Sequence, residues 1–246
     1  MAWSTPIDWT AKAIRYKVTR ADMQTISDAL SALAGIDLVV PGWIDAPHTW
    51  NYTGPAGFRI DGVDATSLYS YGTKLSCTDG GSTKYGYAGE AQYVGGNTLV
   101  AFIGGSAYTL SGGSITNPRF SLFATPYGFP GSFAYTPAYG GWAATPSPLD
   151  CSFSIQGRKL SAWINVIGTS AAGATTITLP VAAAAAPAAG AQFPCRVVDN
   201  GGASAEGLAV TTASSAVVTF YRDIALTAFT TSGGKAIYGA HINVPI

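Results

Sequence analysis

Side chains that could carry out acid–base or nucleophilic chemistry are few in this chain of 246 residues. It has two histidines, His48 and His241, and two glutamates, Glu90 and Glu206. A nucleophile–histidine–carboxylate triad through His241 and Asp223 is conceivable, but no Gly-x-Ser-x-Gly elbow supports it. No spacing places two carboxylates together, as glycan cleavage requires. The sequence therefore predicts a protein that is not an enzyme and has no catalytic residues.

Metal and cofactor binding are not indicated either. The three cysteines, Cys77, Cys151 and Cys195, show no C-x-x-C spacing, and their odd number and wide separation argue against a disulfide framework. Asp61 and Asp64 lack the ligand series of a calcium loop, so capping of a turn explains them better. We expect buried thiols, no metal site and no cofactor.

Charge is unusually scarce along the chain. Lys and Arg number 13, Asp and Glu number 13, and charged residues make up 11% of the sequence, against about 25% in average domains. Such a surface is typical of proteins that pack against copies of themselves. The absence of a basic run argues against nucleic-acid binding. Val181 to Ala189 is too short, with Pro187 inside it, to span a bilayer, and Met1 to Ser4 lacks the basic start of a secretory signal. We therefore expect no membrane association and folding in a cytoplasm.

Residues 1–45 differ in pattern from the rest and are predicted to form an N-terminal anchor. Thr19 followed by Asp22 resembles a capping box, and Gly35 provides a stop, which predicts a helix over about residues 20–34. Its apolar stripe must dock on its own domain, on the same helix of neighbouring subunits, or on a socket in a larger assembly. The residues expected to anchor or oligomerise are Trp3, Trp9, Met23, Ile26, Leu30 and Leu33.

Two stretches of short alternating segments predict a mainly β fold. Residues 46–119 are expected to form a first β domain and residues 151–246 a C-terminal β-sandwich domain, each an antiparallel sandwich or barrel-like unit. The clearest predicted strands and turns are Leu68–Cys77, the Asp79–Gly81 turn, Lys84–Ala91, the Gly95–Asn97 turn, Thr98–Ile103, Lys159–Ile167 and Ile237–Val244.

Residues 120–150 form an aromatic segment rich in Pro and Gly, which we interpret as an ordered connector between the two β units. Tyr127, Tyr135, Tyr139 and Trp142 could stack against sugar rings. The same rings could instead fill an interface between domains or subunits, where such residues are enriched.

Three parts of the chain resemble structural proteins of bacteriophage particles. The opening Trp3-Ser4-Thr5-Pro6 with Trp9, followed by Val18–Asp22 and Ile26–Leu33, is similar to a "W-T-P-x-x-W" start that leads into a helix. It departs from that pattern at Met23-Gln24 and at Ser27-Asp28-Ala29. Further similarity to phage tail, fibre and C-terminal β modules lies in Phe58–Gly62, Gly72–Leu75, Lys84–Gly86, Asn97–Val100, Phe153–Leu160, Ile167–Thr169, Thr178–Val181 and Gly239–Ile242.

The resemblance implies a virion protein of the tail-fibre or minor tail type, assembled in the bacterial cytoplasm. It implies a homotrimer whose N-terminus faces the particle, with sister chains and other virion proteins as partners and host attachment as its role. The alternatives are a capsid decoration or head-fibre protein and a receptor-binding module that recognises a host glycan or surface protein.

Overall fold

Two antiparallel β-sheets make up the part of the chain that the structure describes. The computed structural model describes residues 42–183 and 190–246, without the side chains of Pro148 and Leu149. These residues contain no helix, so none among them is long and apolar enough to cross a membrane. The prediction of a mainly β fold is confirmed. The predicted helix over residues 20–34 and the six anchor residues lie outside the described residues.

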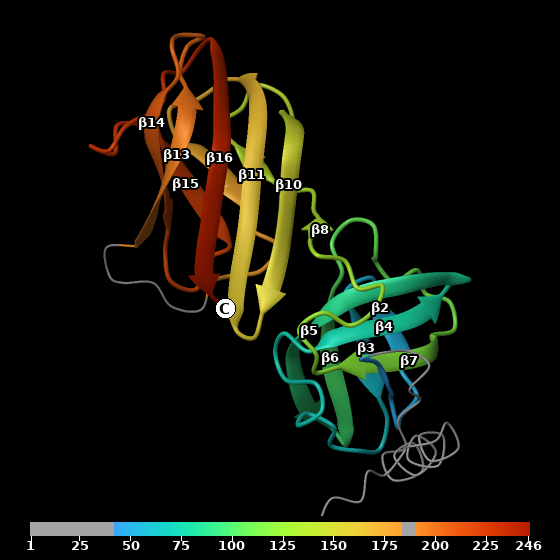
Figure 1. Ribbon diagram of the computed structural model, residues 1–246. Helices are drawn as coiled ribbons and strands as arrows, with labels where there is room; N and C mark the ends of the chain where they lie inside the picture. Colours follow the sequence, from blue (N-terminus) through green and yellow to red (C-terminus); the bar gives the residue numbers. More distant parts are fainter. Residues whose placement is uncertain (1–41, 184–189) are drawn as a thin grey trace, which may run out of the picture. The chain divides into compact units, whose positions relative to one another are not determined.

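The first sheet has seven strands in the order β1-β7-β4-β5-β6-β3-β2 (Figure 1). All of its strand pairs are antiparallel. The strands are β1 (Ile44–Asp45), β2 (Asn51–Gly54), β3 (Gly57–Ile60), β4 (Lys74–Asp79), β5 (Ser82–Val94), β6 (Asn97–Ile103) and β7 (Thr116–Ser121).

The turn between β5 and β6 shows why the hairpins form where they do. Val94 pairs with Asn97, which leaves Gly95 and Gly96 as a two-residue loop. Their φ angles are 59° and 83°. Positive φ at both central positions is what the tight turns that match the strand twist require, and glycine adopts it without steric cost.

One predicted strand is wrong at its start. A strand over Leu68–Cys77 was expected, but β4 begins only at Lys74. The preceding residues turn instead, because Gly72 has a φ of 84° and the Thr73 N–H donates to the Ser70 carbonyl. The apolar alternation of this stretch concealed the turn.

An aromatic stack fills the core of the first sheet. The rings of Trp50 and Phe58 stack at 4.1 Å, and Tyr69 meets both edge-on. The Trp50 indole N–H donates to the Tyr69 hydroxyl at 3.0 Å, so the polar ends of both buried rings are satisfied.

The second sheet has nine strands in the order β8-β10-β11-β16-β13-β14-β15-β12-β9, of which β13, β16, β11 and β10 lie side by side in Figure 1. The strands are β8 (Phe133–Ala134), β9 (Tyr139–Gly140), β10 (Ser147–Gln156), β11 (Lys159–Thr169), β12 (Thr175–Thr178), β13 (Ala191–Val198), β14 (Ala205–Thr211), β15 (Val217–Tyr221) and β16 (Gly234–Pro245).

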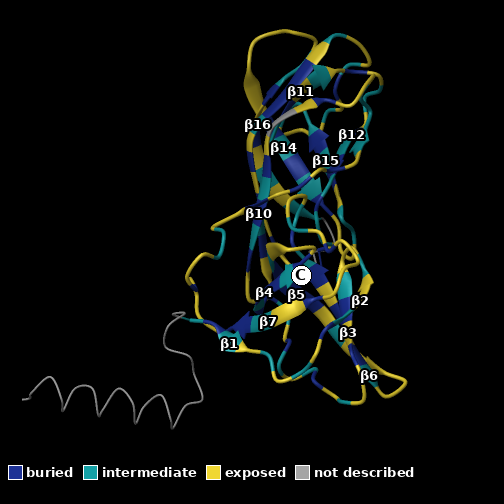
Figure 2. Cartoon of the chain, turned by 90° about the vertical axis from the view of Figure 1, so that its right-hand side faces the viewer, coloured by how far each residue is buried: buried dark blue, intermediate teal, exposed yellow. Residues whose placement is uncertain are grey.

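Period-two alternation places one face of this sheet in a core. Along β11 and the second half of β16, every second residue is buried, as the colours of Figure 2 show. The buried side chains of β10, β11 and β16 share one cluster with those of β12, β14 and β15. The sheet therefore folds over on itself and encloses a single core.

The aromatic segment 120–150 belongs to both sheets. Phe120 and Ser121 end β7, whereas β8, β9 and the start of β10 lie in the second sheet. The Tyr135 N–H donates to the Cys151 carbonyl at 2.9 Å, and the Thr178 N–H donates to the Ala138 carbonyl at 3.0 Å. Backbone hydrogen bonds thus hold much of this segment in place.

Residues 42–246 form one compact unit in which aromatic rings join the two sheets. Tyr87 of β5 contacts Phe129 at 5.1 Å and Phe133 at 5.2 Å, both edge-to-face. Phe133 also packs against Phe153 of β10 at 5.6 Å. The Ser106 N–H adds a hydrogen bond to a backbone carbonyl of β8 at 2.8 Å.

The closest backbone approach at this junction yields a stability prediction. A Cβ at Gly72 would lie 2.2 Å from the Gly157 carbonyl oxygen, whereas a Cβ at Gly62 would meet nothing within 4 Å. Both glycines have positive φ. We expect Gly62→Ala to cost about 1 kcal/mol from backbone strain alone. Gly72→Ala should cost at least about 3 kcal/mol, because overpacking adds to that strain. Urea unfolding measures both variants, and an equal loss of unfolding free energy in Gly62→Ala and Gly72→Ala would contradict close packing at this junction.

Candidate functional site

A pocket at the meeting point of the two sheets is the best-formed candidate site. It has a volume of about 220 Å³. Its walls come from the start of β4, the middle of β5, the loop that follows β7 and the end of β10. The lining residues are Lys74, Tyr87, Ala124, Thr125, Phe129, Pro130, Gly131, Ser154, Ile155 and Gln156.

Lys74 supplies the charge of this pocket. Its ammonium lies 5.7 Å from the centre of the Phe129 ring. Within residues 42–183 and 190–246, no carboxylate forms an ion pair with Lys74 and no acceptor hydrogen-bonds its ammonium. Partial burial removes water from the charged form and lowers the pKa of Lys74. Among the described residues, this cation is therefore compensated only by an aromatic face.

Uncharged polar groups and aromatic rings complete the pocket. The polar groups are the hydroxyls of Thr125 and Ser154, the Gln156 amide and the backbone of Gly131. Tyr87 is 2% exposed, and burial raises the pKa of its hydroxyl despite an opposing hydrogen bond with the Ile155 backbone. Among the lining residues there is no nucleophile paired with a base, so this arrangement is suited to binding.

Sequence reasoning missed this pocket, although one signal was present. The Asp79–Gly81 turn could have fixed the register of the following hairpin, in which Asp79 pairs with Ser82 and Lys74 with Tyr87. A lysine directly opposite a tyrosine on one face of a hairpin is then expected. The contributions of Phe129 and Ser154 could not be predicted, because they come from distant segments.

The four aromatic residues predicted to bind a glycan or form an interface do not share one exposed surface. Tyr127 is 76% exposed, whereas Tyr135 is 8% exposed. Tyr139 and Trp142 are half-buried and meet edge-on at 6.4 Å. Burial raises the pKa of Tyr139 to about 12, and that of Tyr135 is raised as well, with nearby Cys151 adding to both effects.

A buried lysine explains the position of Trp142. Lys235 is 1% exposed, and its ammonium lies 4.4 Å from the centre of the Trp142 ring and 5.6 Å from that of Phe229. It donates to the Gly141 carbonyl at 2.5 Å and to the Thr175 hydroxyl at 2.8 Å. Burial lowers the pKa of Lys235 to about 8, although the charge of Asp199 opposes this effect. These contacts give Lys235 a structural role.

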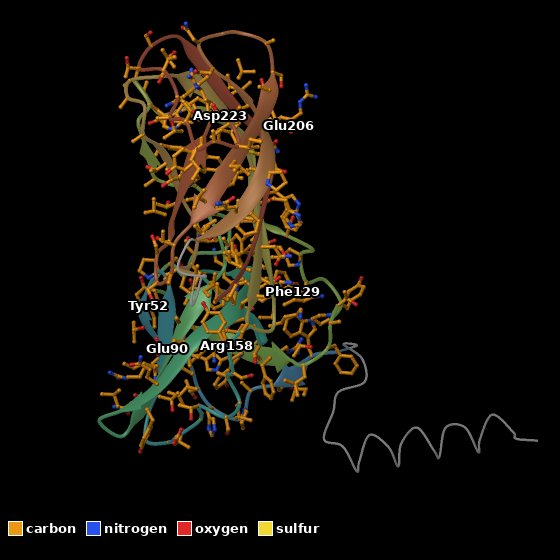
Figure 3. All side chains as sticks on the ribbon, turned by 90° about the vertical axis from the view of Figure 1, so that its left-hand side faces the viewer. Tyr52, Glu90, Phe129, Arg158, Glu206 and Asp223 are labelled. Carbon is orange, nitrogen blue, oxygen red and sulfur yellow. The ribbon has the colours of Figure 1, made fainter. Side chains whose placement is uncertain are left out.

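The residues considered for catalysis lie apart from one another. His241 stacks on Trp163 at 4.8 Å on the outer face of β11 and β16. Asp223 accepts hydrogen bonds from the backbone N–H groups of its own turn, and no hydrogen bond joins it to His241 among the described residues. Figure 3 shows Glu90 on the first sheet and Glu206 on the second.

The metal ligands considered from sequence are also explained by local structure. Asp61 pairs with Arg59 at 2.5 Å, and Asp64 accepts from the N–H and hydroxyl of Thr66. No group of three or more His, Cys, Asp or Glu residues suited to a metal ion occurs in the part of the chain that the structure describes. The three cysteines are buried thiols, and burial raises the pKa of Cys77 to about 12 and that of Cys195 to about 11.

The loop after β7 presents apolar side chains on a fixed backbone. Leu122 is 73% exposed and Phe123 61% exposed. The Phe123 N–H donates to the Ser121 hydroxyl at 3.1 Å, and the indole N–H of Trp43 donates to the Tyr127 carbonyl at 2.8 Å. We call Leu122, Phe123 and Tyr127 the apolar loop. The side chains of the apolar loop are therefore exposed although the backbone of the loop is hydrogen-bonded.

Comparison of the chain with protein-family models, with curated proteins and with solved structures gave no match. The arguments for function therefore depend on the residues of this chain.

The buried Lys235 predicts an unusual pH dependence of stability. Its folded-state pKa of about 8 lies below the ordinary value of 10.5, so the unfolded chain binds more protons between these pH values. The Lys235 contribution to the free energy of unfolding should therefore rise with pH across this window. Since one pKa unit corresponds to about 1.4 kcal/mol, the rise should reach at most roughly 3 kcal/mol.

Urea unfolding of the wild type and of Lys235→Met across this window measures the effect. Buried tyrosines and cysteines, whose pKa values are raised, should destabilise both proteins at alkaline pH and cancel in the difference. The exposed Lys159→Met provides the control and should leave the slope unchanged. A stability difference between wild type and Lys235→Met that is constant with pH would contradict the expected proton linkage.

Proposed function

We propose that this chain is a structural subunit of a bacteriophage particle, similar to tail-fibre proteins, that assembles with copies of itself and acts by binding. Its sequence motifs resemble those of virion proteins. Its two antiparallel sheets, in a chain of which 11% of the residues are charged, suit a part that sister chains cover. The proposed assembly is a homotrimer anchored to the particle by the N-terminal segment.

The single observation that carries the assembly proposal is the apolar loop. Exposing three large apolar side chains to water is unfavourable, by about 25 cal/mol for each Å² of apolar surface that is not buried. Here the Tyr127 carbonyl accepts a hydrogen bond from Trp43 and the Phe123 N–H donates one to Ser121, so the side chains of the loop are presented on a supported backbone. Apolar side chains on such a support favour a protein–protein contact, and the partner we propose is a second copy of this chain.

Two other roles would use the same N-terminal segment and β units. A capsid decoration or head-fibre protein would use the same N-terminal anchor on a different socket. A receptor-binding module would contact a host glycan, and the pocket beside Lys74 favours that role for one region of the chain. Imaging of labelled particles separates tail from head, and adsorption assays with the purified chain detect competition for a receptor.

Self-association should depend on the apolar loop. We expect the purified wild type to form an oligomer in sedimentation velocity, and Phe123→Ser with Tyr127→Ser to weaken association by at least about tenfold, since each buried aromatic ring contributes about 1.5–3 kcal/mol. The fold should survive, because the hydrogen bonds of this loop use backbone groups of these two residues. Tyr93→Ser, at an aromatic residue 49% exposed on β5, is the matched control. A monomeric wild type, or dissociation caused only by Tyr93→Ser, would contradict the proposal.

Attachment to the particle should depend on the predicted apolar stripe of residues 20–34. Leu30→Asp places a charge on that stripe, so we expect loss of incorporation into particles while circular dichroism still reports folded β units. Ser31→Asp adds the same charge about 100° away on the predicted helix and should be incorporated normally. Immunoblotting of purified particles measures both variants, and normal incorporation of Leu30→Asp would count against the anchor.

A further inference from the structure

We propose that the pocket between the two sheets binds an acidic sugar, a pyranose that carries a carboxylate, with the Lys74 ammonium facing that carboxylate. The inference deepens the proposed function, since it names the chemical class that an attachment protein of this kind would recognise. It rests on four features of the pocket: a cation with no ion-pair partner among the described residues, the aromatic surface of Phe129, several polar lining residues and a small volume.

The cation selects for an anion. Lys74 is half-buried, and the pocket lining contains no Asp or Glu. An ammonium that has lost part of its water regains favourable interactions when a carboxylate enters the same space. The Lys74 ammonium lies 5.7 Å from the centre of the Phe129 ring, and no described residue accepts a hydrogen bond from it, so its N–H donors are available to a ligand.

The walls and rim select for a ring with hydroxyl groups. Phe129 is half-buried and offers apolar surface on which the C–H face of a sugar can lie, and the buried Tyr87 supports it edge-on at 5.1 Å. Across the pocket, the hydroxyls of Thr125 and Ser154 and the amide of Gln156 offer both donors and acceptors. A ligand that combines one negative charge with several hydroxyls satisfies all of these groups.

The volume limits the ligand to a single ring. Pockets for drug-sized ligands measure about 300–1,000 Å³, and this pocket measures about 220 Å³. A peptide segment or a nucleotide would therefore extend beyond the pocket. Binding of nucleic acid would also require a cluster of cations, whereas the lining of this pocket includes a single cation, Lys74. Of the lining residues, Phe129 is labelled in Figure 3.

The test is a titration of the purified full-length chain with glucuronate, glucose and acetate, followed by calorimetry and by ligand-observed NMR. We expect glucuronate to bind at least about tenfold more tightly than either glucose or acetate, because it alone satisfies both the charge and the rim. If glucose bound as tightly as glucuronate, the carboxylate and hence Lys74 would not contribute to binding. If acetate bound as tightly as glucuronate, the sugar ring would not contribute. Either result, or the absence of glucuronate binding, overturns the proposal.

Variants locate the site. Lys74→Gln keeps a polar side chain without the charge and should weaken glucuronate binding at least about tenfold, with thermal melts confirming the fold. Lys84→Gln removes a half-buried lysine of the same hairpin, opposite Cys77 and outside the pocket, and should bind as the wild type does. Unchanged binding by Lys74→Gln overturns the proposal. So does a loss found instead in Trp163→Ala, which would place the sugar on the stacked Trp163–His241 pair.

Failure of this inference and failure of the proposed function give different results. A chain that forms oligomers and enters particles but binds no glucuronate refutes only the ligand. A chain that binds glucuronate through Lys74 but stays monomeric and outside particles refutes the structural role, while the sugar site stands.

Discussion

Edge-to-face packing of aromatic rings joins the two sheets of this protein, and the remaining features depend on it. Tyr87 and Phe133 come from different sheets, and Phe129 lies against both at 5.1 and 5.4 Å. Ring pairs of this geometry contribute about 0.5–1.5 kcal/mol each beyond the burial of their area. Because Phe129 and Tyr87 also line the pocket, the contacts that stabilise the junction position the candidate ligand site.

Scarcity of charge shapes both the interior and the surface. Lys235 lies inside the second core with a backbone carbonyl, a hydroxyl and two aromatic rings as its partners. Lys74 is half-buried, and its ammonium lies 5.7 Å from the centre of the Phe129 ring. Among the described residues, aromatic faces accompany cations at three places, since the Arg158 guanidinium also lies 5.7 Å from the centre of the Tyr71 ring. The difference is access: Lys235 is enclosed, whereas Lys74 opens into a pocket.

The apolar loop and the pocket share one structural origin in the segment after β7. Leu122 and Phe123 project outward from the loop, whereas Phe129, a few residues further on, turns inward to the junction. One short stretch of chain therefore carries the surface that we propose for assembly and also lines the candidate pocket.

The sequence by itself determined the β class, the absence of catalytic motifs and many hairpin positions, such as the turn at Gly95 and Gly96, because side-chain alternation and glycine turns act over a few residues. It did not determine that Tyr135 is buried while Tyr127 is exposed, or that Lys74, Phe129 and Ser154 meet. Those outcomes depend on how the aromatic segment passes from the first sheet to the second and packs beside β10. Tertiary packing decided them, since contacts between distant segments leave no periodic signal in a single chain.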